Sequence, residues 1–396
     1  MSTLSVNSIR HTGASSDAVT LASDGTATAK ITNNLSNRNL VINGDFSINQ
    51  RGNASSTSSG FQVADRWEMY MNGNNANFTQ SLSDVAAGTT PYELGFRKAF
   101  KVLNAGQSGP DTGDTIRFQQ KVEDKNIATS GWNYKSASSY LTCSFWAKAS
   151  VAQSYLFNIL ARSDEGSASD IRNFSSTFAL SANTWTKVTV KIPGSSVLTF
   201  DNDTGRGLDI AIWPFMGTFN TTSGHTVDTW ATYSSSDLAP DMTSTWWTTS
   251  NATFEITGFQ LEVGDVATDF EHRSYGDELA RCQRYYYLHA HGATADSNSN
   301  APVANAANYN STVSFGVVHF PVTMRSFPTI DAVVGTSYFR LYSDGGADPF
   351  DNVSLQQSSP QSYILRFDGN LSGTAGYASW VQTNNSAAKV AFQAEL

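Results

Sequence analysis

The sequence predicts an all-β protein: an antiparallel β-sandwich, then a short helix and a smaller C-terminal β domain, with an extended N-terminal anchor segment in front. Short runs of alternating apolar and polar residues recur along the chain, and turn residues separate them. Aromatic residues make up 12% of the 396 residues, and Gly, Ser, Thr and Asn fill the gaps, which suits strands and turns. No helical pattern interrupts the first set of strands, so antiparallel pairing is expected.

Residues 1–38 are the predicted N-terminal segment, and the first aromatic residue of the chain is Phe46. Such a segment buries too little apolar surface to offset its ordering entropy alone. It is either a disordered leader or an anchor that orders against a partner or against copies of itself. The apolar pair Val19 and Leu21 before the Asp24-Gly25 turn favours the anchor.

The predicted sandwich spans residues 39–270. It begins with a strand and an Asn-Gly turn at 39–50 and continues with alternating runs. The clearest runs lie at 96–102, 116–122, 140–148, 187–192 and 208–212. Residues 213–250 lack a strand period and are predicted to form a long loop with exposed or half-exposed aromatic side chains.

The stretch 253–287 links the two β domains. Its apolar positions change parity after Gly258, which indicates a β-bulge in a strand. A helix follows at about 274–288, within a connecting segment 271–291, and Ser274 can cap it. One face of this helix carries Tyr275, Leu279, Cys282 and Tyr286. This face must pack either on its own sandwich or on other subunits, so these four residues are the candidate oligomer interface.

Residues 292–396 are predicted to form the second β domain, after a polar linker at 292–310. Alternating runs at 313–317, 363–367 and 390–396 support this assignment. The last run indicates that the final residues belong to a sheet.

Charge and cysteine content exclude several classes of partner. The net charge is −9 without any basic cluster, so nucleic acid is not expected to bind. Cys143 and Cys282 lie on apolar faces and are expected to act as small hydrophobes. The N-terminus lacks the apolar core of a signal peptide, and no run is long enough to insert into a membrane. Synthesis in a cytoplasm is therefore expected.

No catalytic motif is present, so the protein is not expected to be an enzyme. A nucleophile elbow, a phosphate-binding glycine loop and zinc-type Cys/His spacing are all missing from the sequence. His289 and His291 are either two metal ligands or the start of a polar linker. The loop from Asp201 to Gly205 is either a hairpin or a site for a structural calcium ion. No other cofactor is expected.

The loop region 213–250 supplies the best candidate binding site. Trp230, Tyr233, Trp246 and Trp247 have Asp and Asn neighbours, and flat aromatic rings beside polar groups are typical of sugar-binding sites. These rings could instead pack between subunits or onto the sandwich. Both interpretations remain open at this point.

Several motifs resemble phage tail-fibre-like virion proteins. They are NLVINGDFSINQRG (39–52), ADRW (64–67), LTCSFWAKAS (141–150) and FQLEVGDVATDFEHRSYGDELARCQRYY (259–286). The N-terminal TLSVNSIRHTG (3–13) resembles the start of such fibres on the virion side. The run at 141–150 is similar to the central strand of carbohydrate-binding jelly rolls, so the resemblance implies a jelly-roll sandwich.

The resemblance also implies a function. A virion structural protein of a marine phage or cyanophage would dock to the particle through residues 1–38, form a homotrimer, and adsorb to host-surface glycan. The protein would be made in the host cytoplasm and then belong to the virion. Two other functions stay open: a non-adhesive structural component, such as a head-decorating fibre or spacer, and a glycan depolymerase.

Overall fold

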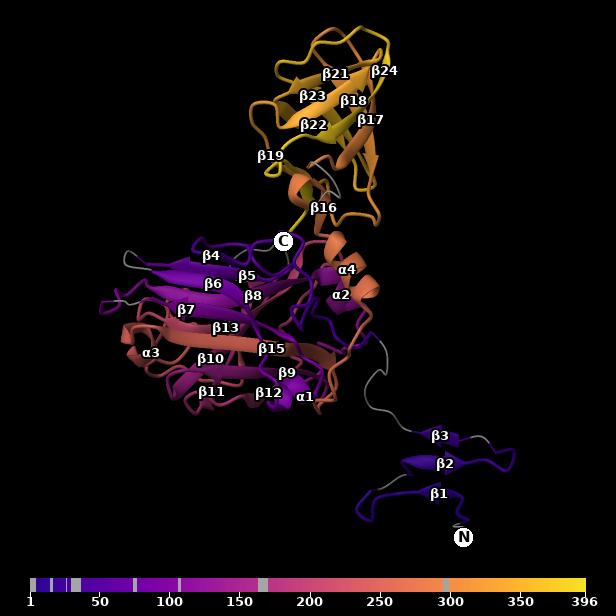
Figure 1. Ribbon diagram of the computed structural model, residues 1–396. Helices are drawn as coiled ribbons and strands as arrows, with labels where there is room; N and C mark the ends of the chain where they lie inside the picture. Colours follow the sequence, from indigo (N-terminus) through magenta and orange to yellow (C-terminus); the bar gives the residue numbers. More distant parts are fainter. Residues whose placement is uncertain are drawn as a thin grey trace.

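The computed structural model describes residues 5–14, 17–25, 27–29, 37–73, 77–105, 108–162, 170–294 and 299–396. Figure 1 shows a large β-sandwich, a smaller β domain beside it, and the C-terminus between the two. The predicted all-β class is confirmed. Within residues 1–38, three short strands pair antiparallel: β1 (Ser8–Ile9), β2 (Val19–Leu21) and β3 (Ala27–Ala29). Residues 30–36, which complete the predicted anchor, lie outside the described residues.

Two antiparallel sheets form the sandwich, and the predicted jelly roll is confirmed. In spatial order, the first, called the groove sheet here, contains β14 (Trp230–Thr232), β11 (Arg172–Leu180), β10 (Gln153–Ala161), β13 (Arg206–Met216), β8 (Thr115–Glu123) and β5 (Glu68–Asn72). The second, called the back sheet, contains β12 (Thr186–Pro193), β9 (Tyr140–Ala149), β15 (Ala252–Val263), β7 (Lys98–Asn104), β6 (Phe78–Asp84) and β4 (Ser55–Ser56). Short helices α1 (Thr90–Glu93), α2 (Asp124–Ala128) and α3 (Thr245–Thr248) lie in the connections.

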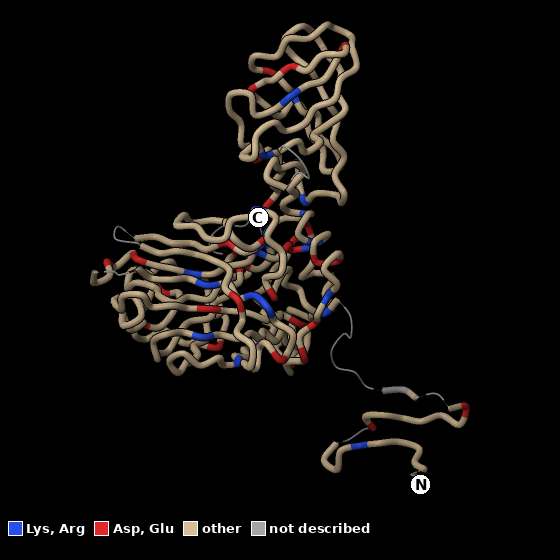
Figure 2. Tube along the Cα trace, viewed as in Figure 1, with Lys and Arg blue, Asp and Glu red and all other residues tan. Residues whose placement is uncertain are grey.

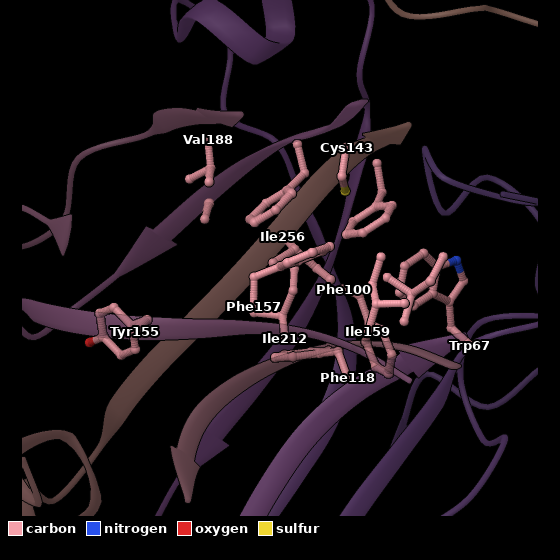
Figure 3. Close-up of a cluster of buried hydrophobic side chains, with 14 of the residues drawn as sticks. Trp67, Phe100, Phe118, Cys143, Tyr155, Phe157, Ile159, Val188, Ile212 and Ile256 are labelled. Carbon is pink, nitrogen blue, oxygen red and sulfur yellow. The ribbon is translucent and has the colours of Figure 1, made fainter. Parts of the chain in front are cut away.

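Side chains from alternate positions of both sheets fill the space between them. Figure 3 shows part of this core, where Phe118, Phe157 and Ile212 of the groove sheet meet Phe100 and Ile256 of the back sheet. Neighbouring strand positions therefore point outward, because the side chains of a strand alternate between its faces. These outward positions of the groove sheet form the site described below.

The predicted bulge at Gly258 is confirmed. The pairing of β15 with β9 shifts between Thr257 and Gln260, and Gly258 has a φ of +61°. A Cβ atom at this position would lie 2.5 Å from the ring of Phe96. Both the positive φ and this close contact favour glycine.

The connecting helix is shorter than predicted. Helix α4 runs from Tyr275 to Gln283, and the Oγ of Ser274 accepts a hydrogen bond from the backbone N–H of Asp277, 3.2 Å away, as the predicted cap. The helix ends before Tyr286, which instead begins strand β16 (Tyr286–His291). This strand pairs with β25 (Lys389–Gln393), and this long-range pairing overrides the helical pattern of the local sequence.

The apolar face of α4 packs on its own sandwich, which is the first of the two arrangements that the sequence left open, so its residues are not available together as the candidate oligomer interface. Cys282 is fully buried against Ile42 and Ile48 of the N-terminal part of the sandwich, and Leu279 packs partly against the same cluster. Tyr286 is also fully buried, whereas Tyr275 is 65% exposed. The four residues therefore do not form one surface that another subunit can reach.

The C-terminal domain has its own core between two sheets. The smaller sheet contains β16, β25 and β19 (Thr329–Val333). The larger sheet contains, in spatial order, β21 (Gly346–Phe350), β20 (Phe339–Ser343), β24 (Ala378–Thr383), β17 (Pro302–Asn308), β18 (Ser314–His319), β23 (Ser362–Asp368) and β22 (Asn352–Ser358). A 3₁₀ turn at Gly292–Thr294 follows β16.

Buried ion pairs join the two domains at a junction. Figure 2 shows acidic and basic residues gathered there, near the C-terminus. The carboxylate of Glu395 pairs with Arg66 and, at 3.2 Å, with Arg51. Arg284 donates two hydrogen bonds of 2.7 Å to Glu123 of the sandwich. The motif residues 64–67, all buried, therefore help to hold the last residues of the chain against the sandwich.

Candidate functional site

Trp246 and Trp247 belong to the core, so the prediction that they form an exposed sugar platform is wrong. Both side chains are 0% exposed. Helix α3 folds their loop back over the end of the sandwich, where Trp246 stacks on Phe78 and Trp247 contacts Phe215 at a centroid distance of 4.9 Å. The side-chain amide of Asn104 donates to both of their backbone carbonyl oxygens and fixes this turn.

The other two predicted residues lie apart from this pair. Trp230 is half-buried against Phe174, and its indole N–H donates to the carbonyl oxygen of Pro193, 2.7 Å away. It thereby links the edges of the two sheets. Tyr233 is half-buried and lines a groove on the outer face of the groove sheet. Only Tyr233 of the four predicted residues therefore reaches a cavity.

This groove has a volume of about 680 Å³ and runs across the outward side chains of the groove sheet. Its walls come from β5, β8, β10, β13 and the connections that join the strands of the sandwich. The lining residues used below are Glu68 and Tyr70 of β5, Arg117, Gln119 and Lys121 of β8, Asn158 of β10, Arg162, and Arg206, Asp209 and Trp213 of β13. Because most of them stand on paired strands, their positions are fixed before any ligand arrives.

The guanidinium group of Arg117 occupies the aromatic part of the groove. Its Cζ atom lies 4.2 Å from the ring centroid of Tyr70 and 4.6 Å from that of Trp213. Its Nε donates to the side-chain oxygen of Gln119 at 2.6 Å, and Gln119 in turn donates to Glu68 at 2.5 Å. Cation–π contacts and this chain of hydrogen bonds hold the arginine in one orientation.

A second polar cluster lies on the neighbouring strands. Arg162 pairs with Oδ2 of Asp209 at 2.6 Å, while Oδ1 of Asp209 is buried and has no partner in the structure. The amide of Asn158 donates to the side-chain oxygen of Asn173 at 2.5 Å. The groove thus combines flat rings with fixed donors and acceptors, which is the chemistry that recognises a sugar ring and its hydroxyl groups.

Sequence reasoning missed most of the groove because its residues look like the ordinary polar side of amphipathic strands. The run Thr115–Glu123 alternates as any half-buried strand does. One signal was available: Trp213 and Tyr70 fall on the same parity as polar neighbours, and large aromatic residues on an outward face are unusual. Which strands lie side by side was not readable from the sequence.

A Ser–His–Asp chain of hydrogen bonds lies beside the groove. The Oγ of Ser175 on β11 is 2.6 Å from Nε2 of His225, and Nδ1 of His225 is 2.8 Å from Asp237. Nucleophilic catalysis uses this arrangement, but the nucleophile must meet its substrate. Ser175 is 0% exposed, so we assign the three residues to fastening the loop that carries His225 and Asp237 onto the sheet.

The candidate metal ligands point to separate partners. Nε2 of His289 lies 2.6 Å from the carbonyl oxygen of Val303, and Nδ1 of His291 accepts from the backbone N–H of Ala293. In the Asp201–Gly205 loop, Asp124 accepts the backbone N–H groups of Asp201 and Asn202. Within the described residues, no group of three or more His, Cys, Asp or Glu side chains is arranged to hold a metal.

The outer face of the larger C-terminal sheet carries a second aromatic surface. The rings of Tyr342 and Trp380 stack at 4.2 Å with an interplanar angle of 6°, and Trp380 is 45% exposed. Val317, on the same face, is 53% exposed.

Comparisons with known proteins give only distant similarities. The structure is similar to the enzymatically active domain of tailspike protein 4 of bacteriophage CBA120, with 14% identity, a TM-score of 0.31, and coverage of 57% of this chain and 21% of that chain. The chain thus spans about a fifth of that structure's length.

Two carbohydrate-binding modules are also similar. One is the family 11 module of a cellulosomal cellulase of Clostridium thermocellum, with 14% identity, a TM-score of 0.27, and coverage of 56% of this chain and 98% of that chain. The other is the CBM22-2 xylan-binding domain of Paenibacillus barcinonensis Xyn10C, with 13% identity, a TM-score of 0.26, and coverage of 51% and 92%. No family model and no curated protein matches the sequence. The fold assignment therefore rests on the sheets described above.

Proposed function

We propose that the protein binds a glycan in the groove of the sandwich. The observation that carries this proposal is the placement of Tyr70, Trp213 and Arg117 on neighbouring strands, with amide and carboxylate side chains around them. The half-buried ring of Tyr70 can cover the C–H face of a sugar, while the buried Trp213 holds Arg117 in place, and the amides and carboxylates bond the hydroxyl groups. The strands hold these groups in place, so little conformational entropy is lost on binding.

We further propose that this binding serves adsorption of a phage particle to its host. The motifs at 39–52, 64–67 and 259–286 support a tail-fibre-like virion protein, in which residues 1–38 dock to the particle and three copies assemble. Weak sites on three linked chains would act together and raise the overall avidity. Among the described residues, no helix is long and apolar enough to cross a membrane.

The binding test uses affinity gel electrophoresis of the full chain in gels that contain xylan, mixed-linkage β-glucan, alginate or polygalacturonate. At least one polysaccharide should retard the protein, and Tyr70→Ala should weaken that retardation at least ten-fold. Trp213→Leu serves as a second groove variant. Trp185→Ala is the matched control, because Trp185 is a half-buried aromatic residue next to the back sheet.

Two outcomes would contradict the groove as the binding site. Retardation that survives both groove variants but is lost in Trp380→Ala would place the site on the C-terminal domain instead. Absence of retardation, together with absence of binding to host cells, would favour the spacer function. Release of reducing sugar from a retarding polysaccharide would contradict our proposal that the chain is not an enzyme.

The assembly proposals have separate tests. Light scattering should give about three times the 42.8 kDa mass of the chain, and a persistent monomer at high concentration would contradict a trimer. Labelling and imaging of the particle should place the protein on the tail. A position on the head would favour the decorating-fibre alternative.

A further inference from the structure

The charge of the groove differs in sign from that of the whole chain. Among the described residues that line it, four are basic (Arg117, Lys121, Arg162, Arg206) and two are acidic (Glu68, Asp209), which leaves a net charge of four minus two, or +2. The chain as a whole carries −9. A basic cavity in an acidic protein concentrates ligands of negative charge.

Both acidic residues of the groove already have a basic partner. Glu68 lies 3.2 Å from Nζ of Lys121. Asp209 pairs with Arg162 at 2.6 Å and lies 3.8 Å from Arg206. Within the described residues, Arg117 forms no ion pair, and its one hydrogen bond to a protein group comes from Nε. Its two terminal nitrogens are therefore left for a ligand.

The surroundings of Arg117 make its charge costly in the unliganded protein. Burial lowers the pKa of Arg117 from its usual value, because the attraction of Glu68 and Asp209 does not replace the lost water. An arginine stays charged even so. A ligand oxygen with a negative charge would offset this cost.

The neighbouring tryptophan fixes Arg117 from the interior side. Trp213 is 4% exposed, and its ring packs with Leu156, Met216 and Leu238. Its indole N–H is buried and has no acceptor in the structure, so the terminal nitrogens of Arg117 are the donors left for a ligand in the groove. Trp247 also has an unpaired indole N–H, but that group is enclosed in the core and does not line the groove.

We infer that the groove selects acidic glycans, and that Arg117 binds the carboxylate or sulfate group of one sugar residue. This inference rests on the proposed glycan binding and adds the chemical class of the ligand. Carboxylate and sulfate oxygens both accept paired hydrogen bonds from a guanidinium group. Tyr70 and Trp213 then hold the plane of the guanidinium, and the half-buried ring of Tyr70 is left to cover the sugar ring.

The test compares one polymer in two charge states. Affinity electrophoresis and isothermal titration are done on the full chain with polygalacturonate and with fully methyl-esterified polygalacturonate, which has the same backbone without the charge. Alginate and a sulfated galactan are run in parallel, since their acids are a different uronate and a sulfate ester. The variants are Arg117→Gln and, as the matched loss of one positive charge on the back sheet, Lys187→Gln.

An acidic polymer should bind at least ten-fold more tightly than the neutral ester. Arg117→Gln should weaken binding of the acidic polymer about ten- to hundred-fold, which corresponds to the loss of one charge-assisted hydrogen bond. Lys187→Gln should leave the affinity unchanged. Preference for alginate or polygalacturonate identifies a carboxylate ligand, and preference for the galactan identifies a sulfate.

The two levels of the proposal fail in different ways. If neutral xylan, β-glucan or the ester binds as tightly as every acidic polymer, the acidic specificity is wrong while glycan binding stands. If an acidic polymer binds but Arg117→Gln binds it equally, the role of Arg117 is wrong. If none of the acidic or neutral polymers binds, both the acidic specificity and the proposed function are overturned.

Discussion

Arg66 at the junction is buried and Arg117 in the groove is half-buried; both guanidinium groups lie over a tyrosine ring, but their charges are balanced differently. Arg66 lies 3.5 Å from the ring centroid of Tyr285 and forms an ion pair with Glu395. Burial opposes its charge, yet Glu395 raises the pKa of Arg66 above its usual value. Burial lowers the pKa of Arg117, which has no such partner.

The difference separates a structural network from a binding site. At the junction, Glu395 supplies a carboxylate from the chain itself, so the charge of Arg66 is balanced without a ligand, although its buried Nε has no acceptor. In the groove, the terminal nitrogens of Arg117 have no protein partner among the described residues. Lys121 lies between the groove and the junction, because its Nζ pairs with Glu68 of the groove and donates to the carbonyl oxygen of Leu396.

The largest expected loss of stability comes from removing the negative charge of Glu395 at the junction. Glu395→Gln removes the negative charge that faces Arg66 and Arg51, and leaves two buried cations without it. We expect a loss of about 3–5 kcal/mol in the free energy of unfolding. Because the two domains have separate cores, urea unfolding followed by tryptophan fluorescence should also divide into two transitions.

As a control, Glu395→Gln should still bind glycan in the groove at temperatures at which this variant remains folded. The double variant Arg66→Met/Glu395→Leu should recover part of the lost stability, since it leaves no uncompensated Arg66. A Glu395→Gln variant as stable as the natural chain would show that the junction network does not stabilise the fold.

A smaller loss of stability is expected from removing the charge of a second carboxylate, Glu271, which precedes helix α4. Burial alone would raise the pKa of Glu271, but its hydrogen bond from the N–H of Asn39 and the charge of Arg273 lower it below the ordinary 4.5. The stabilisation from this carboxylate is therefore complete above pH 4.5, and it is lost as the pH falls through the lower pKa of the folded state.

The variant Glu271→Gln tests this pH dependence. It should lose about 1 kcal/mol at pH 7, and the difference from the natural chain should shrink as the pH falls below 4.5. Thermal melting at a series of pH values from about 7 down to about 3 measures both quantities. If the difference in stability between Glu271→Gln and the natural chain is the same at every pH, the charge of Glu271 does not stabilise the fold.

The smallest expected effect on stability is that of Arg117→Met. The methionine side chain keeps part of the contact with Tyr70 and Trp213 and removes a charge that the protein does not balance. The free energy of unfolding should change by less than about 1 kcal/mol, or rise, while acidic glycan binding is lost. Arg66→Met, its counterpart at the junction, should instead destabilise the chain. Equal destabilisation by both variants would mean that Arg117 also serves the fold.

Local sequence patterns predicted those features of the backbone that depend on neighbouring residues alone. The bulge at Gly258, the cap at Ser274 and the inward alternation around Cys143 each follow from neighbours within a few positions, and the structure confirms them. Between 213 and 250, the expected exposure is wrong for Trp246 and Trp247, because α3 folds them into the core. Trp230 and Tyr233 are half-buried, as expected.

The β class and the alternation that separates core from surface positions can therefore be read from the local order of residues. Which outward positions meet depends on the way the strands pair in three dimensions. Arg117, Tyr70 and Trp213 come from three strands that lie side by side, and Glu395 reaches Arg66 across 329 positions of the chain. The physical reason is that strand order depends on long-range hydrogen bonding and burial, which the period of a single strand does not encode.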